Sequence, residues 1–410
     1  MKLSIKQILV FVLIFLYCAN IHFIFLPELV RTKLIIGGVG VVYFVFNSLK
    51  GSSQKKIMPL IYTLIPLPLW MLFSIILNQS PDWWFIRFSI IQVVYIMGAW
   101  MIIKVSDVDS VGTIAKFVMY YVVVQNSIAF LGLQIPEVRN IVVLTSFESS
   151  YETQVNQLTY RGLAFGDHVF FGGGVWTCLG LLMIVYLYKI EKLSIIGFIA
   201  LYSYVFFTGL FVARTTVAGL VSIFLLFTPI KKNWYKMIGV IGFGVVFVAF
   251  FGMIQNWMLR EGYSIGNAFE IYNNFISTGE LTSSSSEETR EMWSIIPDNA
   301  KTWIIGDARY NDPQGGYYMH TDVGYLRIIW YGGIIGLFLY LWQIYRFCYL
   351  IRGENVKNYY TKKMLLFYYV VVLILLWKGH SDTSCVLYLM FCASINNSER
   401  INSNHLIQKT

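Results

Sequence analysis

Residues 194–230 read SIIGFIALYSYVFFTGLFVARTTVAGLVSIFLLFTPI, an apolar run whose only charged residue is Arg214. As one helix, the run would reach about 55 Å, whereas the hydrocarbon core of a membrane is about 30 Å thick. The chain must therefore turn back, and the polar group Arg214-Thr215-Thr216 is the place to do so. The run predicts two short apolar helices with the arginine at their turn.

The whole chain shares this apolar character. It is 57% hydrophobic and 13% charged, and soluble domains carry about 25% charged residues. Its apolar runs are continuous, which favours helices over a barrel. We predict an all-α polytopic membrane protein with about eleven or twelve transmembrane helices, drawn from runs at about 8–26, 34–49, 57–77, 85–103, 116–134, 169–188, 194–211, 215–230, 237–254, 322–345, 364–377 and 382–395.

The positive charges predict the orientation. Lysines such as Lys55, Lys104, Lys189 and Lys231 fall in alternate loops, and cytoplasmic loops carry the excess of Lys and Arg. Both ends are then cytoplasmic, residues 1–410 form one integral membrane domain, and the two long loops, 135–168 and 255–320, face outward. The net charge of +9 reflects this topology and does not indicate nucleic-acid binding.

On the outward side the cations are mostly arginine, among them Arg161, Arg214, Arg290 and Arg309. A guanidinium binds phosphate through two parallel hydrogen bonds, whereas a lysine acts as a point charge. One non-functional interpretation is that lysine is the usual topology marker, so that the remaining arginines carry no function. Another is that Arg214 snorkels to lipid phosphate. The functional interpretation is an outward site for a phosphorylated substrate.

Two further segments carry polar side chains that suggest a site. The first long loop closes on Arg161-Gly162 and His168, followed by Gly172-Gly173-Gly174 at a helix start. Glycines let a backbone approach a ligand, and a helix N-terminus favours anions, although a plain loop-to-helix junction has the same pattern.

The second long loop ends at His320 and Asp322, just before an apolar helix. A histidine there can accept a proton near neutral pH, and a carboxylate two residues away can orient it or act as the base itself. The alternative is that both cap the helix. No second His or Cys stands nearby at metal-ligand spacing, so we expect neither metal nor cofactor.

These residues resemble those of the bacterial O-antigen and capsule repeat-unit polymerases, in the O-antigen polymerase and ligase superfamily. The resemblance covers the layout of most of the chain. Two of its motifs are short, Arg161-Gly162 and Ala213-Arg214-Thr215. The third is the stretch from Glu288 to Leu337, whose matching residues are, in order, Arg290, Trp293, Gly306, His320, Asp322, Tyr325, Leu326 and Gly332-Gly333-Ile-Ile-Gly336. The ligase branch usually pairs histidines at the last motif, and Asp322 departs from that pattern.

The resemblance implies a glycosyltransferase-C-like fold in the bacterial inner membrane, with the active site facing the periplasm. It implies transfer of a growing glycan from undecaprenyl pyrophosphate to a hydroxyl of the next lipid-linked repeat unit, without a metal. Arg161, Arg214, Arg290 and Arg309 would hold the pyrophosphate, and His320 or Asp322 would be the base. A chain-length regulator and a flippase are the implied protein partners.

Three other functions fit parts of the sequence. An O-antigen ligase, which transfers finished polymer to lipid A-core, shares the layout and differs in the acceptor. A flippase or transporter should show internal repeats and broken helices at the membrane midplane, and we find no convincing repeat. A non-catalytic assembly scaffold would not need the outward arginines and His320.

Overall fold

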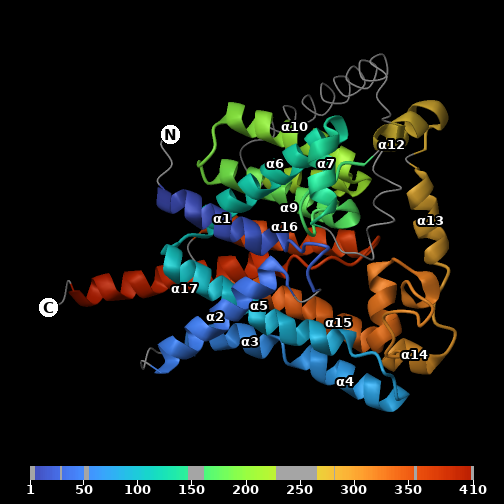
Figure 1. Ribbon diagram of the computed structural model, residues 1–410, viewed down its shortest axis with the longest axis horizontal. Coiled ribbons are helices and arrows are strands. Elements are labelled where there is room, and N and C mark those ends of the chain that lie inside the picture. Colours follow the sequence, from blue (N-terminus) through green and yellow to red (C-terminus); the bar gives the residue numbers. More distant parts are fainter. Residues whose placement is uncertain are drawn as a thin grey trace. The chain divides into compact units, whose positions relative to one another are not determined.

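The computed structural model describes residues 5–27, 30–49, 55–145, 161–227, 266–280, 282–354 and 358–407. Over these residues the chain is almost entirely helical, with no strand beyond isolated bridges of His22 with Arg31 and of Asn311 with Tyr317. The helices (Figure 1) are α1 (Ile5–Ala19), α2 (Thr32–Leu49), η1 (Lys55–Ile57), α3 (Met58–Thr63), α4 (Pro66–Asn78), α5 (Trp84–Ser106), α6 (Val111–Gln134), α7 (Pro136–Val143), α9 (Phe170–Lys189), α10 (Ile195–Val212), η2 (Arg214–Phe227), α12 (Gly266–Thr278), α13 (Ser284–Met292), α14 (Ala300–Ile305), η4 (Tyr318–His320), α15 (Gly324–Glu354), α16 (Tyr359–Leu376) and α17 (Ser384–Ile407).

Eight helical segments of the described chain are long and apolar enough to cross a membrane. They correspond to eight of the predicted runs, and α1 and η2 are shorter apolar helices. All but the first two residues of the run at 382–395 lie within α17, whose second half carries Glu399 and Arg400. The run at 237–254 lies outside the described residues. The chain is an all-α, multi-pass membrane protein.

The predicted turn at Arg214 is confirmed. Helix α10 ends at Val212, Ala213 is extended, and η2 begins at Arg214. The hydroxyl of Thr216 donates to the carbonyl of Gly209 (2.9 Å), so η2 returns along α10. η2 is a 3-10 helix of 14 residues. At about 2.0 Å per residue, it reaches about 28 Å and so nearly matches the thickness of a bilayer core.

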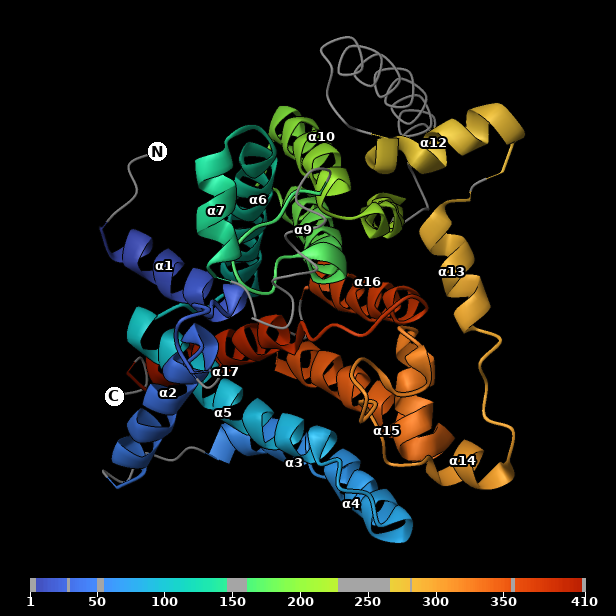
Figure 2. The same cartoon turned by 45° about the vertical axis from the view of Figure 1, so that its right-hand side comes forward.

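Contacts divide the chain into two compact units, Met1–Tyr121 with Thr289–Thr410, and Val122–Glu288. We call them unit 1 and unit 2 and describe each by itself. In unit 1, α2 lies against α5 (Figure 2). A Cβ at Gly40 would be only 2.5 Å from the backbone of Met97 and Gly98. Small residues allow helices in a membrane to approach this closely.

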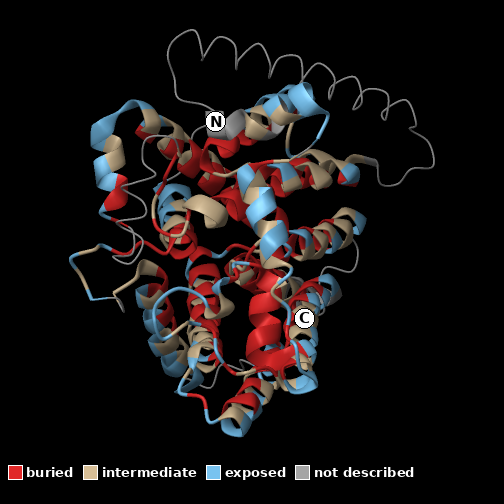
Figure 3. Ribbon diagram, turned by 90° about the vertical axis from the view of Figure 1, so that its right-hand side faces the viewer, coloured by how far each residue is buried: buried red, intermediate tan, exposed pale blue. Residues whose placement is uncertain are grey.

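Unit 2 is built on α9, against which α10 and η2 pack. α9 is the most buried of the eight long helices, with 83% of its 18-residue apolar stretch buried. Its glycines again allow close packing, since a Cβ at Gly180 would lie 2.6 Å from the side chain of Val122. Other helices carry buried and exposed segments side by side (Figure 3), and many exposed side chains are large and apolar, such as Val39, Val42 and Phe46 on α2.

The two predicted outward loops are partly helical. The first, 135–168, contains α7, and its residues 146–160 lie outside the described residues. The second, 255–320, contains α12, α13, α14 and η4, and its residues 255–265 lie outside them as well. Their outward orientation and the boundaries of a single membrane domain stay predictions.

Candidate functional site

A kink in α15 positions the polar segment that precedes this helix. Gly333 has φ 66° and ψ −169°, a conformation that breaks the helix. The carbonyl of Gly332 accepts a hydrogen bond from Nε1 of Trp70 (2.6 Å), and that of Tyr331 accepts one from the hydroxyl of Ser74 (3.0 Å). Since Trp70 and Ser74 both belong to α4, that helix satisfies the carbonyls near the kink.

The same region of α15 receives the segment that follows α14. The amide of Asp307 donates to the carbonyl of Trp330 (2.7 Å), and that of Ala308 donates to Tyr331 (3.0 Å). Gly306, with φ 81°, has no room for a side chain, because a Cβ would lie 2.4 Å from the backbone of Tyr331. The segment is therefore docked on the helix backbone at its first residues.

Asp82, which precedes α5, holds the next part of the segment. One carboxylate oxygen accepts hydrogen bonds from the amides of Tyr310 (2.7 Å) and Asn311 (3.2 Å), and the other accepts from Trp84 (2.9 Å). Sequence reasoning missed Asp82. The available signal was an acidic residue just before an apolar helix, which usually indicates a cap.

Tyrosine rings and a buried arginine lie beside this anchored segment. The guanidinium carbon of Arg327, on α15, lies 3.4 Å from the ring centroid of Tyr317 and 4.1 Å from that of Tyr310. Tyr310 in turn stacks on Trp84, with centroids 3.7 Å apart. Arg327 is only 6% exposed. Arg327 is one of the outward arginines that the sequence predicted, but it was not among the predicted site residues.

His380, between α16 and α17, completes this cluster. Its Nε2 lies 3.0 Å from the hydroxyl of Tyr340, and its Nδ1 lies 3.4 Å from that of Tyr310. Burial and the positive charge of Arg327 together lower the pKa of His380 to about 4, against the opposing effect of Asp382. The imidazole is therefore neutral at pH 7, a form that both donates and accepts a hydrogen bond.

His320 and Asp322, the predicted base and its partner, are both exposed in unit 1. His320 ends η4 with φ 51°, and the amide of Asp322 donates to the sulfur of Met292 (3.3 Å). Among the described residues no hydrogen bond joins their side chains, and neither side chain caps α15. Beneath them Val323, Leu326 and Trp330 form a buried apolar cluster.

Arg309 and Arg290 also belong to unit 1, and both are exposed. The guanidinium of Arg309 lies 5.7 Å from the ring centroid of Tyr318, whose hydroxyl donates to Asp307 (3.2 Å). Arg290 is on α13. Arg309, His320 and Asp322 therefore all lie on the segment Asp307–Asp322, whose first residues are held by α15 and Asp82.

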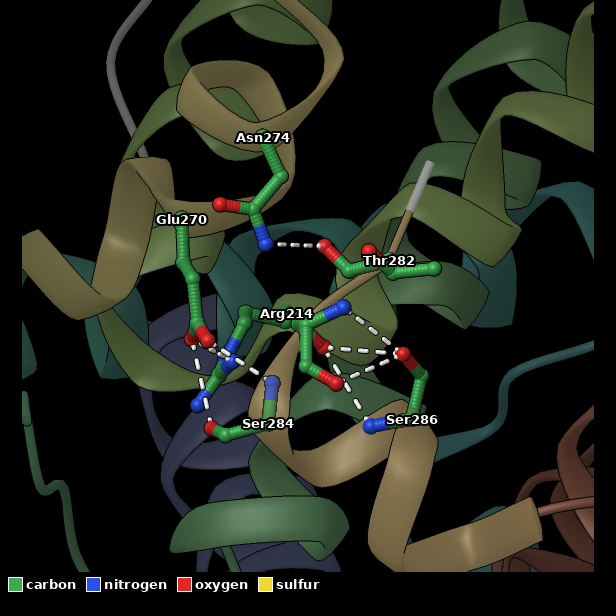
Figure 4. A network of polar contacts seen from close by, with 7 residues as sticks. Arg214, Glu270, Asn274, Thr282, Ser284 and Ser286 are labelled. Atoms are coloured by element: carbon green, nitrogen blue, oxygen red, sulfur yellow. Dashed lines mark hydrogen bonds and ion pairs between the residues drawn. The ribbon is translucent and has the colours of Figure 1, made fainter. Parts of the chain in front are cut away.

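Arg214, in unit 2, already has an acidic partner. Its Nη1 forms an ion pair with Glu270 of α12, and the two side chains are only 11% and 23% exposed. The other oxygen of Glu270 accepts a hydrogen bond from the amide of Ser284 (2.7 Å). Figure 4 shows the side chains of Arg214 and Glu270 pointing toward one another, with Ser284 at the same carboxylate. Phosphate binding by Arg214 would have to compete with this carboxylate.

Two other predicted features of unit 2 contact protein groups near the turn before α9 and the turn at Arg214. The guanidinium of Arg161 lies 5.7 Å from the ring centroid of Phe170. Glycines 173 and 174 approach the arginine turn, because a Cβ there would lie 2.3 Å from Val212 and 2.9 Å from Ala213. These two glycines therefore allow the start of α9 to pack closely against the turn at Arg214.

His168 is fully buried in unit 2. Its Nε2 lies 2.8 Å from the side-chain oxygen of Asn126, and burial lowers its pKa to about 3. A neutral, buried histidine of this kind fixes the loop before α9 and does not present a proton acceptor to a substrate.

The fold and the site define the class of the chain as an all-helical, multi-pass membrane protein with a polar, aromatic-rich segment anchored before a long kinked helix. Comparison with protein-family models, with curated proteins and with solved structures found no match.

Proposed function

We propose that the protein is a bacterial inner-membrane glycosyltransferase that polymerises lipid-linked oligosaccharide repeat units, with its active site facing the periplasm. One observation carries the proposal. The segment Asp307–Asp322 is anchored on α15 and Asp82, and it presents His320, Asp322 and Arg309 at exposed positions beside tyrosine rings. A proton acceptor, a cation and flat aromatic faces are what the transfer of a sugar from a phosphorylated carrier requires.

The reaction follows from these residues. An acceptor hydroxyl of the incoming repeat unit attacks the anomeric carbon of the growing chain, and the bond from that carbon to the pyrophosphate oxygen breaks. His320 takes the hydroxyl proton, with Asp322 as its partner or as the alternative base. The bonding electrons leave with undecaprenyl pyrophosphate, and guanidinium groups stabilise its negative charge.

The predicted phosphate-binding arginines differ in how accessible they are to a substrate. Arg309 and Arg290 are exposed in the same unit as His320, so they are free to meet a substrate at the surface. Arg214 engages Glu270, and it would reach a pyrophosphate only after that ion pair opens. Partly exposed rings such as Trp303 offer stacking faces for sugars.

The test expresses variants of the protein in a strain that lacks the gene and compares their surface-polysaccharide ladders on gels. His320→Ala and Asp322→Asn are compared with Lys301→Ala, an exposed residue of α14, at equal protein level. Loss of a general base costs about 10²- to 10⁴-fold in rate, so the ladder should collapse to core plus one repeat unit in at least one variant. A full ladder in both variants would rule out the proposed site.

The deletion strain separates the rival functions. Core with a single repeat unit indicates the polymerase. Bare core with lipid-linked polymer accumulating indicates a ligase, and single repeats trapped on the cytoplasmic face indicate a flippase. Either of the last two results would overturn the proposal.

A further inference from the structure

Arg327 is a buried cation without an anion. It is 6% exposed, its Nε is buried without a hydrogen-bond acceptor, and among the described residues it forms no ion pair. Removing a charge from water without pairing it is strongly unfavourable. Two tyrosine rings offset only part of this cost.

Three acidic residues, Asp82, Asp322 and Asp382, lie near this cluster of Arg327, Tyr310 and His380. Asp322 is exposed, and the other two are engaged elsewhere. Asp82 accepts the amides of Tyr310 and Asn311. Asp382 accepts hydrogen bonds from the side chain of Gln92 (2.8 Å) and from the amide of Ser384 (3.0 Å). Each of these two carboxylates thus satisfies groups of its own surroundings. Among the described residues, none of the three carboxylates forms an ion pair with Arg327, so its donors are available to an anionic ligand.

The rings determine which part of the guanidinium can bind. Tyr317 and Tyr310 lie at 3.4 Å and 4.1 Å from its central carbon, and the two rings are inclined at 73° to one another, so the cation lies against two aromatic groups. A stacked guanidinium keeps its N–H donors along its edge, in the fork that matches two oxygens of a phosphate. The neutral imidazole of His380 bonds Tyr310 and Tyr340 and adds no second positive charge at neutral pH.

We propose that Arg327, held against Tyr310 and Tyr317, is a phosphate-binding site of unit 1. The ligand is a phosphate or pyrophosphate group, either of a lipid carrier or free in solution. The identification of the lipid carrier rests on the proposed function, whereas the binding of the anion does not. This site differs from those that the sequence predicted, because Arg214 has Glu270 as a partner and Arg290 and Arg309 are exposed.

The experiment uses the full-length protein in nanodiscs and two probes, inorganic pyrophosphate and farnesyl pyrophosphate. Binding and the thermal midpoint are measured for the wild type, Arg327→Lys and Arg327→Met. The matched control is Arg346→Lys, since Arg346 is also on α15 and also stacks on aromatic rings, at 5.2 Å from Tyr349, but is only partly buried.

A bound anion should raise the midpoint of the wild type, because it binds only the folded protein. Arg327→Lys should weaken binding about 10- to 100-fold, the cost of losing hydrogen bonds to a charged group. Arg327→Met should lose the anion-dependent rise and, without anion, melt above the wild type, because it removes an uncompensated buried charge. Arg346→Lys should bind as the wild type does.

The two probes distinguish the source of the phosphate. A shift by farnesyl pyrophosphate alone identifies a lipid carrier, and a shift by both probes identifies a site for the phosphate group itself. No shift with either probe, or an undiminished shift in Arg327→Met, overturns the proposal. Anion binding that depends on Arg327 in a protein whose deletion leaves the polysaccharide ladder intact would instead reject the proposed function and keep this site.

Discussion

Gly333 is the residue on which the kink of α15 depends most directly. Its φ of 66° and ψ of −169° lie in a region essentially restricted to glycine, where another residue costs about 1–3 kcal/mol. A Cβ at this position would also lie 2.1 Å from the carbonyl oxygen of Ile304 and 2.2 Å from its carbonyl carbon. Both atoms are backbone, so no side-chain rotation can relieve the overlap.

Gly333→Ala should therefore destabilise the protein through two separate effects. Overpacking of this kind typically costs about 1–3 kcal/mol, which brings the total to about 2–6 kcal/mol when added to the conformational strain. Gly316→Ala is the matched control, because Gly316 has φ 83° and open space where its Cβ would stand. It should lose only the conformational part, about 1–2 kcal/mol.

The assay is thermal unfolding of the purified protein followed by tryptophan fluorescence. Trp70, whose Nε1 donates to the carbonyl of Gly332, lies at the kink and should report its loss. Polymer length in cells carrying each variant adds a functional measurement, since the kink positions the segment before α15. Equal loss of stability in Gly333→Ala and Gly316→Ala would refute the claim that the backbone of α14 packs this tightly on α15.

Two more predictions concern ionisable side chains, Glu270 and His380. Glu270→Gln should lower the stability of unit 2 by about 1–3 kcal/mol, because it leaves Arg214 with a neutral partner in a largely buried setting. A double-mutant cycle with Arg214→Gln measures the coupling energy between the two residues, and a coupling energy of zero would disprove the stabilising ion pair. The pKa of His380 is about 4 in the fold against 6.5 when unfolded, so its contribution to stability is present above pH 6.5 and is lost as the pH falls toward 4. Thermal midpoints between pH 4 and pH 7 should show a shallower decline for His380→Gln, while an unchanged decline would contradict the assignment.

Much of the architecture could be predicted from apolar run length. Eight of the predicted spans reappear as long apolar helices, because lipid forces each spanning backbone to satisfy its own hydrogen bonds. The turn at Arg214 followed from the same argument, since an apolar run too long for one crossing has to turn back. Composition could not show that the second arm is the 3-10 helix η2, because that depends on close packing against Gly209 and Cys178.

For the candidate site, too, some features could be predicted from the sequence and others could not. The sequence by itself determined that a polar segment ending at His320 and Asp322 interrupts an otherwise apolar chain, because polar composition is a local property. Only the tertiary structure decided which charges have partners. Arg214 pairs with Glu270, 56 positions away, whereas Arg327 is buried against tyrosine rings without an anion. Local sequence carries no record of such distant pairings, and the free energy of a buried charge depends almost entirely on them.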